Sequence, residues 1–351
     1  MQSLPTAQSG SPPAALFEYL LWGNRVLSDF DLGEVELFRD AVSVSANTSG
    51  AIRVAQAAEQ DWTKAESRVL EYCLEDGTIW QESWNAGGCF VSRFPGLCSF
   101  RISPAEMRIE CAPQPEVNGP TVVHLILDHA IPRLLSMKPG HLVLHASAVQ
   151  VDGEVMAILG HSGQGKSTLA GWFASRGFSI LTDDCLLLRR DESKQQWLAY
   201  PSYQSVRLWP DSVNALGIDE ASLREFAHYS SKKRTGKETN FRFAPGGAPL
   251  RACFVLDAGD EGAAEHSGPP EIQPIPVGQI FVALMLAVFR LDAEDEEINR
   301  REFEILTNLA DTVKFWSLRY ERRYDWLPHV EKIMIDALRS SGREHEKGRP
   351  Y

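Results

Sequence analysis

Short stretches that alternate between apolar and polar residues, separated by glycine and proline, fill the first third of the chain. Residues 42–45 and 52–54 alternate in this way, and repeated glycines punctuate the remainder. Alternation with a period of two is typical of strands that bury one face, and glycine marks the turns between them. The pattern therefore predicts a β-rich accessory or substrate-docking domain over residues 16–115. A Ser/Pro/Gln-rich segment over residues 1–15 precedes it and is expected to be a flexible tail.

The pattern changes in the second third of the chain. Residues 121–137 have the spacing of a helix, which Pro132 should kink or split. Residues 142–150 predict one strand and the apolar run over residues 155–159 predicts a second, and the Asp152-Gly153 pair between them predicts a hairpin turn.

The last part of the chain is expected to hold two strands and then two or three helices. Their expected ranges are 252–256 and 272–277 for the strands, and 277–291, 297–316 and 326–338 for the helices. The apolar run over residues 280–289 is about half as long as a membrane-spanning helix requires, so it predicts a buried helix. Residues 340–351 are polar and are expected to form a second flexible tail.

Composition and charge narrow the class of protein. The chain of 351 residues is 44% apolar and 23% charged, which is close to the average of globular proteins and allows a buried core. Its net charge of −12 disfavours nucleic acid as a partner, because an acidic surface repels phosphate backbones. The six cysteines form no Cys-x-x-Cys pair, and the first residues are neither basic nor apolar. These features predict reduced thiols, no signal peptide, no membrane and a cytoplasmic location.

A glycine-rich motif follows the second strand of the predicted hairpin. The sequence GHSGQGKS fits G-x-x-x-x-G-K-[ST] at every fixed position, and a predicted helix follows it. In such loops backbone N–H groups turn toward phosphate oxygens, the lysine reaches the β- and γ-phosphates, and the serine hydroxyl ligates Mg²⁺. The alternative is a glycine-rich turn that matches by chance. The expected ATP-binding residues are Gly160, His161, Ser162, Gly163, Gln164, Gly165, Lys166, Ser167 and Thr168.

Two adjacent carboxylates end the next predicted strand, residues 178–182. A parallel neighbouring strand would place Asp183 and Asp184 beside the glycine-rich loop, where one can hold Mg²⁺ and the other can accept a proton from an attacking hydroxyl. A helix cap or turn is the alternative role for such a pair. The short separation from Lys166, and the lack of an Asn-Lys-x-Asp motif, disfavour a motor ATPase or a GTPase.

Further side chains are candidates for the same site. His145 lies in the first hairpin strand, and antiparallel pairing through the turn would bring it near Gly160. Residues 232–237 are the densest basic segment of this acidic chain. That segment is either a solvated loop or a mobile loop that closes over the triphosphate, with Arg234 neutralising the transferred charge. Binding of an acidic peptide is a third alternative for it. Arg207 is another candidate, although its Leu-Trp-Pro setting could equally reflect packing.

The segments LHASAV, GHSGQGKSTLA and RGFSILTDD occur in this order and resemble the HPr kinase/phosphorylase family. Within it the chain is most similar to the related serine kinases, including those that phosphorylate ribosomal peptides such as lasso-peptide precursors. The likeness is strong over residues 140–190 and loose elsewhere. The chain departs from the better-known HPr kinases in its N-terminal region, in lacking a recognisable phosphorolysis motif, and at His161, where they usually have aspartate.

The resemblance implies an α/β fold, with a P-loop kinase domain of the HPr kinase/PEP carboxykinase-like type and a mixed sheet over residues 120–339, after the smaller β-rich domain. It also implies an ATP- and Mg²⁺-dependent serine kinase that acts on a peptide or small protein, with a homo-oligomer as a further implication. The candidate catalytic residues are then Asp183 as base, His145, Lys166 and Arg234, and the metal ligands are Ser167 and Asp184. The two acids could exchange roles, because such a pair can titrate as a unit. The alternatives are a small-molecule hydroxyl kinase on the same scaffold and a non-catalytic nucleotide-sensing partner in peptide maturation.

Overall fold

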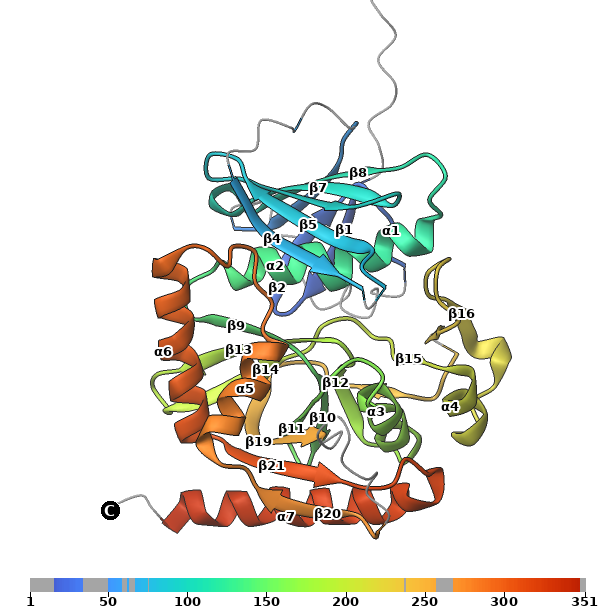
Figure 1. Ribbon diagram of the computed structural model, residues 1–351. Coiled ribbons are helices and arrows are strands. Elements are labelled where there is room, and N and C mark those ends of the chain that lie inside the picture. The colour runs from blue at the N-terminus through green and yellow to red at the C-terminus, as the bar shows by residue number, and fades with distance from the viewer. Residues whose placement is uncertain are drawn as a thin grey trace, which may run out of the picture.

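The computed structural model describes residues 16–33, 50–58, 62, 67–74, 76–236, 238–256 and 268–347, with side chains to residue 341. The expected tail over residues 1–15 and the alternating residues 42–45 lie outside these ranges. Two large sheets dominate the described structure, and Figure 1 shows them one above the other with a helical segment between them.

The N-terminal sheet has eight strands in the order β1-β2-β3-β8-β7-β6-β5-β4. β3 pairs in parallel with β2 and β8, and the other neighbours pair antiparallel. The predicted alternation is confirmed at residues 52–54 in β3, where Ile52 and Val54 are buried. The strands are β1 (Phe17–Leu21), β2 (Asn24–Ser28), β3 (Ile52–Gln56), β4 (Ser67–Cys73), β5 (Ile79–Asn85), β6 (Phe90–Phe94), β7 (Cys98–Ser103) and β8 (Arg108–Pro113), with the 3₁₀ turn η2 (Pro104–Glu106) between the last two.

A helical segment lies under this sheet and shares its core. It consists of α1 (Gly119–Leu125), the π-helix η3 (Ile126–Ala130) and α2 (Ile131–Ser136). Leu125, Ile126 and Leu134 are fully buried in one cluster with Phe94 and Phe100 of the sheet. The predicted interruption at Pro132 takes the form of the π-turn that directly precedes α2, because proline cannot donate the backbone bond of a regular turn. The segment therefore packs with the N-terminal sheet, although its sequence position follows the expected domain boundary.

The second sheet has ten strands, of which eight follow the order β18-β12-β10-β11-β19-β14-β13-β9, and β21 pairs with β19 and β20. Helices α3 and α7 pack with this sheet in one hydrophobic cluster, and α5 and α6 pack with it in a second cluster. The strands are β9 (His141–His145), β10 (Ser147–Val151), β11 (Glu154–Leu159), β12 (Ser179–Thr182), β13 (Cys185–Asp191), β14 (Gln196–Tyr200), β18 (Arg242–Phe243), β19 (Ala248–Leu256), β20 (Glu271–Pro274) and β21 (Lys314–Arg319). The helices are α3 (Lys166–Ser175), α5 (Val277–Ala287), α6 (Glu296–Thr312), η5 (Tyr324–Trp326) and α7 (Leu327–Lys347).

A small third sheet lies beside α3 and α4 (Pro210–Ala215), in the order β15-β17-β16. Its strands are β15 (Arg207–Leu208), β16 (Leu223–Glu225) and β17 (Lys233–Thr235), with the 3₁₀ turn η4 (Glu220–Ser222) before β16. Leu208 contacts the α3 face at Gly171, where an added Cβ would lie 3.3 Å from a Leu208 methyl carbon. This packing fixes the small sheet against the helix that follows the glycine-rich loop.

The predicted hairpin is confirmed, but the single strand expected over residues 142–150 is wrong. Asp152 and Gly153 have φ values of 51° and 84°, and Val151 pairs with Glu154 across the turn. Such positive φ values at both turn residues are typical of a type I′ hairpin. The run divides at Ala146 into β9, which pairs with β13, and β10, which pairs with β11 and β12. The run is mostly apolar and contains neither glycine nor proline, so its pattern did not reveal the break.

Two expectations for the C-terminal helices are also corrected. The helix predicted over residues 297–316 ends at Thr312, and the next residues form β21, parallel to β19. Aromatic and apolar residues such as Phe315 and Leu318 suit a buried strand as well as a helix. Helix α7 continues to Lys347, through part of the tail expected over residues 340–351.

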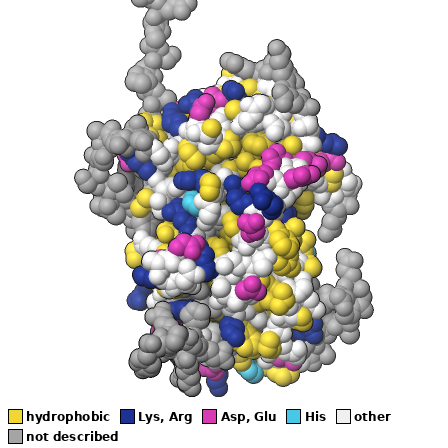
Figure 2. Space-filling model, turned by 90° about the vertical axis from the view of Figure 1, so that its left-hand side faces the viewer, with side chains coloured by type: hydrophobic (Ala, Val, Ile, Leu, Met, Phe, Trp, Pro, Cys, Tyr) yellow, Lys and Arg dark blue, Asp and Glu magenta, His cyan; other side chains and the backbone are white. Residues whose placement is uncertain are grey.

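The apolar run over residues 280–289 is not fully buried. Within α5, Ile280, Leu284 and Ala287 are buried, whereas Val282 and Leu286 are 60% and 64% exposed. Figure 2 turns the α6 side of the molecule toward the viewer and shows apolar side chains at this surface. None of the helices in the described ranges is long and apolar enough to cross a membrane.

Candidate functional site

The glycine-rich loop joins β11 to α3 and is closed by its own side chains. The Nζ atom of Lys166 donates to the carbonyl oxygens of Gly160 at 2.7 Å and His161 at 3.1 Å. The backbone N–H of His161 donates to Gln164 Oε1 at 2.8 Å. Gly160 has a φ of 153°, which residues with a side chain rarely adopt, and an added Cβ would lie 3.1 Å from the Cβ of Leu256, so glycine is favoured there. The strand, loop and helix thus have the order that the motif predicts.

Lys166 is a buried cation at the start of α3. Burial lowers its pKa to about 8, and Asp184 and Asp183 oppose that shift because they favour the charged form. These two carboxylates are therefore close enough to act on the lysine through space. Anionic oxygens placed beside the loop would favour the charged lysine further.

Neighbours that the sequence did not single out surround the loop. Arg322, beyond β21, donates from Nη1 to the carbonyl oxygen of Gly163 at 3.3 Å. The hydroxyl of Thr168 hydrogen-bonds to that of Ser212 at 2.9 Å. The Tyr320 hydroxyl would lie 3.6 Å from a Cβ at Gly165. Side chains from α4 and from the segment after β21 thus contact residues of the glycine-rich loop. These segments are distant from the loop in sequence, and only the tertiary structure brings them near it.

Asp183 follows β12 and lies next to the loop. The Ser147 hydroxyl donates to its Oδ1 at 3.1 Å, and the backbone N–H of Arg207 donates to its Oδ2 at 2.8 Å. Burial raises the pKa of Asp183, while Arg207 and a side-chain hydrogen bond from Ser167 act to lower it. Ser147 also pairs with Ile158 in β11, so it joins the strand before the glycine-rich loop to the first acid of the pair. The expected parallel neighbour of β11 is in fact two positions away, because β10 lies between β11 and β12.

Asp184 is surrounded by groups that favour its charged form. His145 Nδ1 lies 3.1 Å from its Oδ1, and Arg207 Nη2 contacts the same oxygen. Burial alone would raise the pKa of Asp184, but Arg207 and His145 hold it well below the usual range. The two adjacent acids therefore differ: Asp184 is fixed as a carboxylate, and Asp183 takes up a proton more readily.

His145 reaches the acids by a route other than the one expected. Antiparallel pairing through the hairpin turn ends at Ser147 opposite Ile158, so the hairpin does not carry His145 toward Gly160. Instead His145 pairs with Cys185 across β9 and β13, one residue beyond Asp184. The position of His145 at the site was therefore predicted, but by the wrong strand pairing.

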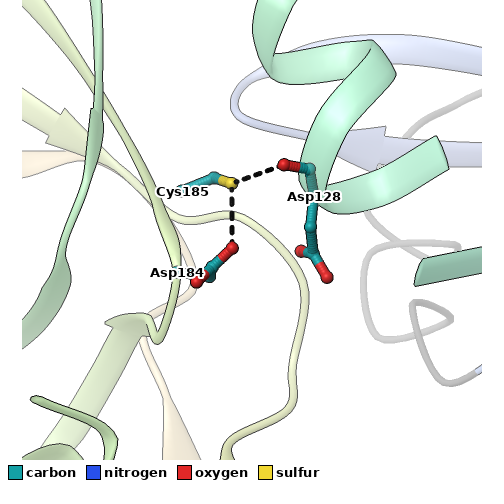
Figure 3. A group of neighbouring side chains, drawn as sticks. All are labelled: Asp128, Asp184 and Cys185. Carbon is teal, nitrogen blue, oxygen red and sulfur yellow. Dashed lines mark hydrogen bonds between the residues drawn. The ribbon is translucent and has the colours of Figure 1, made fainter. Parts of the chain in front are cut away.

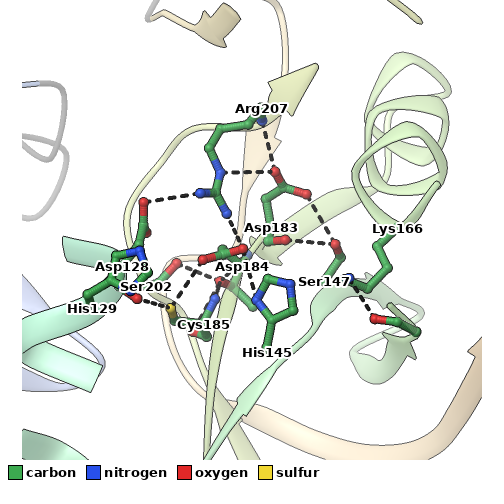
Figure 4. A network of polar contacts seen from close by, with 12 residues as sticks. Asp128, His129, His145, Ser147, Lys166, Asp183, Asp184, Cys185, Ser202 and Arg207 are labelled. Atoms are coloured by element: carbon green, nitrogen blue, oxygen red, sulfur yellow. Dashed lines mark hydrogen bonds and ion pairs between the residues drawn. The ribbon is translucent and has the colours of Figure 1, made fainter. Parts of the chain in front are cut away.

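Arg207 is the centre of the charged network in Figure 4. Its Nη1 lies 3.2 Å from Asp128 Oδ2, its Nε lies 3.8 Å from Asp183 Oδ2, and its Nη2 contacts Asp184. Burial alone would lower the pKa of Arg207, but Asp184 and Asp128 hold it well above the usual range. The cation thus links the acid pair to a third carboxylate.

That third carboxylate, Asp128, comes from the π-helix and was not predicted. It also accepts hydrogen bonds from His124 Nδ1 at 2.6 Å and from the Tyr203 hydroxyl. An aspartate inside an apolar helical run, four residues before Pro132, was the one available signal. π-turns are frequent at functional sites, and here the turn connects the helical segment under the N-terminal sheet to the acid pair.

Asp128, Asp184 and Cys185 lie close enough to be considered as a metal centre (Figure 3). The Cys185 thiol donates to the Asp128 carbonyl oxygen at 3.7 Å and to Asp184 Oδ2 at 3.5 Å. Burial raises its pKa well above the usual value, and the charges of Asp184 and Asp128 raise it further, so it remains a thiol. Because a metal-ligating cysteine must be a thiolate, these three residues do not suit a metal ion in this arrangement.

The basic segment is a short strand rather than an open loop where the structure describes it, and Lys237 lies outside those residues. Arg234 is buried in β17, and its guanidinium carbon lies 5.3 Å from the ring centroid of Tyr203 and 5.9 Å from that of Phe226. Lys232 lies over the ring of Trp209 at 5.0 Å. The structure thus brings both cations to the site, but it places Arg234 against aromatic rings rather than against the glycine-rich loop.

No protein-family model matches the chain, and no curated protein matches its sequence. Ninety chains of solved structures match the coordinates. One is the HPr(Ser) kinase/phosphatase from Coxiella burnetii, at 12% identity and a TM-score of 0.28, covering 59% of this chain and 99% of that chain. A TM-score this low carries no argument, so the interpretation of the site rests on the residues described above.

Proposed function

We propose that the protein is a kinase that transfers the γ-phosphoryl group of ATP to a serine hydroxyl of a peptide or small protein. The observation that carries this proposal is the strand order β12-β10-β11, in which β10 pairs antiparallel with both neighbours, so that the end of β12 with Asp183 and the end of β11 with the glycine-rich loop share one edge of the sheet. A phosphate-binding loop and a potential proton acceptor are thereby held side by side. Phosphoryl transfer requires both groups in that relationship.

In the proposed reaction each residue has a role that follows from its surroundings. Lys166 and the loop N–H groups hold the phosphates, and the lysine gains charge as they bind. Asp183 accepts the proton of the attacking serine hydroxyl, because burial raises its pKa toward the working range. Arg207 and His145 keep Asp184 ionised. Arg207 also fixes the direction of both acids through its contacts with their carboxylates.

The donor set fits Mg²⁺, which prefers hard oxygen ligands. The Ser167 hydroxyl and the carboxylate of Asp184 would hold it, with Asp183 beside them. Bound there, the ion would neutralise charge on the phosphates. The six cysteines are all free thiols, which suits the reducing cytoplasm that we propose as its location.

The test is intact-mass analysis of candidate peptides, including those encoded beside this gene, after incubation with ATP and Mg²⁺. Transfer adds about 80 Da for one phosphoryl group on serine. The Lys166→Ala variant should give no such gain, and an equal gain in that variant would overturn the assignment of the loop. ATP binding without transfer to any peptide or small alcohol would instead support a nucleotide-sensing partner.

A further inference from the structure

Three arginines lie on one face of the small sheet β15-β17-β16. Arg234 on β17 pairs in register with Arg207 on β15 and with Arg224 on β16, so the three side chains leave the sheet on the same side. Arg224 is paired with Glu238. Lys233, the residue before Arg234 in β17, points to the opposite side. The exposures agree, because Lys233 is exposed and Arg234 is only 8% exposed.

These cations differ in their partners. Arg207 is surrounded by three carboxylates of the site. Among the described residues Arg234 has no ion-pair partner, and its buried Nε and Nη2 atoms make no hydrogen bond. Its close neighbours are the rings of Tyr203 and Phe226. Arginine stays ionised in proteins, and aromatic faces offset only part of the cost of burying an unpaired charge.

Arg234 lies at the end of the site next to the helical segment under the N-terminal sheet. Its guanidinium carbon lies 5.9 Å from the ring centroid of Phe226, and that ring lies 4.3 Å from the ring of His124 in α1. The other ring beside Arg234, that of Tyr203, donates its hydroxyl to Asp128 in the π-helix. One aromatic ring therefore separates Arg234 from each of these two residues of the helical segment.

We infer that Arg234 binds a carboxylate carried by the peptide acceptor, close in sequence to the serine that is phosphorylated. The inference rests on the proposed kinase function and specifies its substrate class. One surplus positive charge is balanced by one monoanion, and the planar guanidinium matches a carboxylate in shape. A phosphate dianion would instead leave a surplus negative charge beside Asp128. Because Arg234 is so deeply buried, its ligand must be a small charged group rather than an extended surface.

The experiment uses fluorescent serine peptide pools in which one flanking position at a time carries Asp or Asn, with a free or an amidated C-terminus. Both phosphorylation and ATP-independent binding are measured for the wild type, Arg234→Gln and Lys233→Gln. The last variant is the matched control, since it removes the same charge from the opposite face of the same strand. We expect the wild type to prefer the best carboxylate pool about tenfold through KM, which corresponds to one carboxylate contact. If only peptides with a free C-terminus are preferred, the carboxylate that Arg234 binds is the C-terminal carboxylate of the peptide rather than the side chain of an aspartate.

Arg234→Gln should lose that preference in both assays, and Lys233→Gln should keep it. An equal preference in the wild type and Arg234→Gln, or no preference in the wild type, overturns the inference. Where Arg234→Gln fails to fold, Arg234→Lys serves instead, and it should show a weaker preference because it lacks the guanidinium fork. Arg234-dependent binding of carboxylate pools without phosphorylation would overturn the kinase proposal alone. Phosphorylation that is indifferent to both the carboxylate and Arg234 would overturn the carboxylate site alone.

Discussion

The backbone N–H of Ala146 donates to the carbonyl oxygen of Asp184 at 2.9 Å, where β9 ends and β10 begins. This bond fixes Ala146 at the acid pair, and with it the two neighbours of Ala146 in the chain, His145 and Ser147. His145 reaches the Asp184 carboxylate, and Ser147 reaches that of Asp183. One strand break therefore supplies a separate hydrogen-bonding partner to each acid.

Replacing His145 with alanine should slow phosphoryl transfer by about tenfold to a hundredfold, which is typical for loss of a group that assists proton transfer. The pKa of Asp184 should rise, because one of the groups that lower it is removed. Nucleotide binding should persist, since His145 does not contact the glycine-rich loop. The measurement is kcat against pH, together with ATP affinity. An unchanged pH profile and rate would show that His145 is only structural.

Replacing Asp183 with asparagine and replacing Asp184 with asparagine should have different effects. Asp183→Asn keeps the shape and removes the proton acceptor, so Mg²⁺–ATP binding should remain while transfer falls by at least about a hundredfold. Asp184→Asn should weaken the Mg²⁺ dependence of nucleotide binding, because its carboxylate is the one held ionised. Calorimetry with and without Mg²⁺ gives both results. If Asp183→Asn loses metal-dependent binding instead, the roles of the two acids are reversed.

The sequence could predict those parts of the site whose roles depend on residues close together in the chain. The residues from Gly160 to Ser167 form one strand–loop–helix unit, so their roles depend on neighbours within the motif. Asp128 could not be found in this way. It meets Arg207 across 79 residues of sequence, and its neighbours in the chain are those of an ordinary buried helix. Only the packing of the π-turn against β13 gives this aspartate a place at the site.

The same limit of sequence-based prediction applies to the fold. It arises where the local pattern is compatible with more than one secondary structure or strand pairing. Residues 142–150 combine apolar residues with His145, Ser147 and Gln150, a mixture that suits one continuous strand, so their pattern does not mark the change of pairing at Ala146. Phe315 and Trp316 were assigned to the end of a helix, but parallel pairing with β19 makes them a strand. Tertiary pairing decided both cases, because the buried edges of the second sheet must satisfy their backbone hydrogen bonds.

The affinity for ATP should fall as the pH rises past about 8. Burial lowers the pKa of Lys166 to about 8 in the free protein, so the neutral lysine predominates above that value. Phosphates bind the charged form, and affinity should therefore drop by up to about tenfold per pH unit above it. Binding measured from pH 6.5 to 9.5 checks this. Lys166→Arg is the control, because arginine stays charged and any residual binding should not show this fall.

Removing Arg207 should destabilise the fold more than removing an exposed arginine. Arg207→Met leaves the carboxylates of Asp128 and Asp184 buried without their cation, which should lower the free energy of unfolding at pH 7 by about 3–5 kcal/mol. Arg339→Met is the control. Arg339 pairs with Asp152 at 3.0 Å with both side chains largely exposed, and its loss should cost about 1 kcal/mol or less.

The pH dependence distinguishes lost charge pairing from lost packing in Arg207→Met. Burial opposes ionisation of Asp128 and Asp184, but Arg207 holds both pKa values below the usual range. Their contribution to stability is therefore present above the unfolded pKa of about 4 and is lost as the pH falls through the folded values. The difference between wild type and Arg207→Met, measured by urea unfolding, should thus be largest near neutral pH and shrink in acid. A difference that stays constant with pH would mean that Arg207 stabilises the protein by packing against Phe226 rather than by its charge.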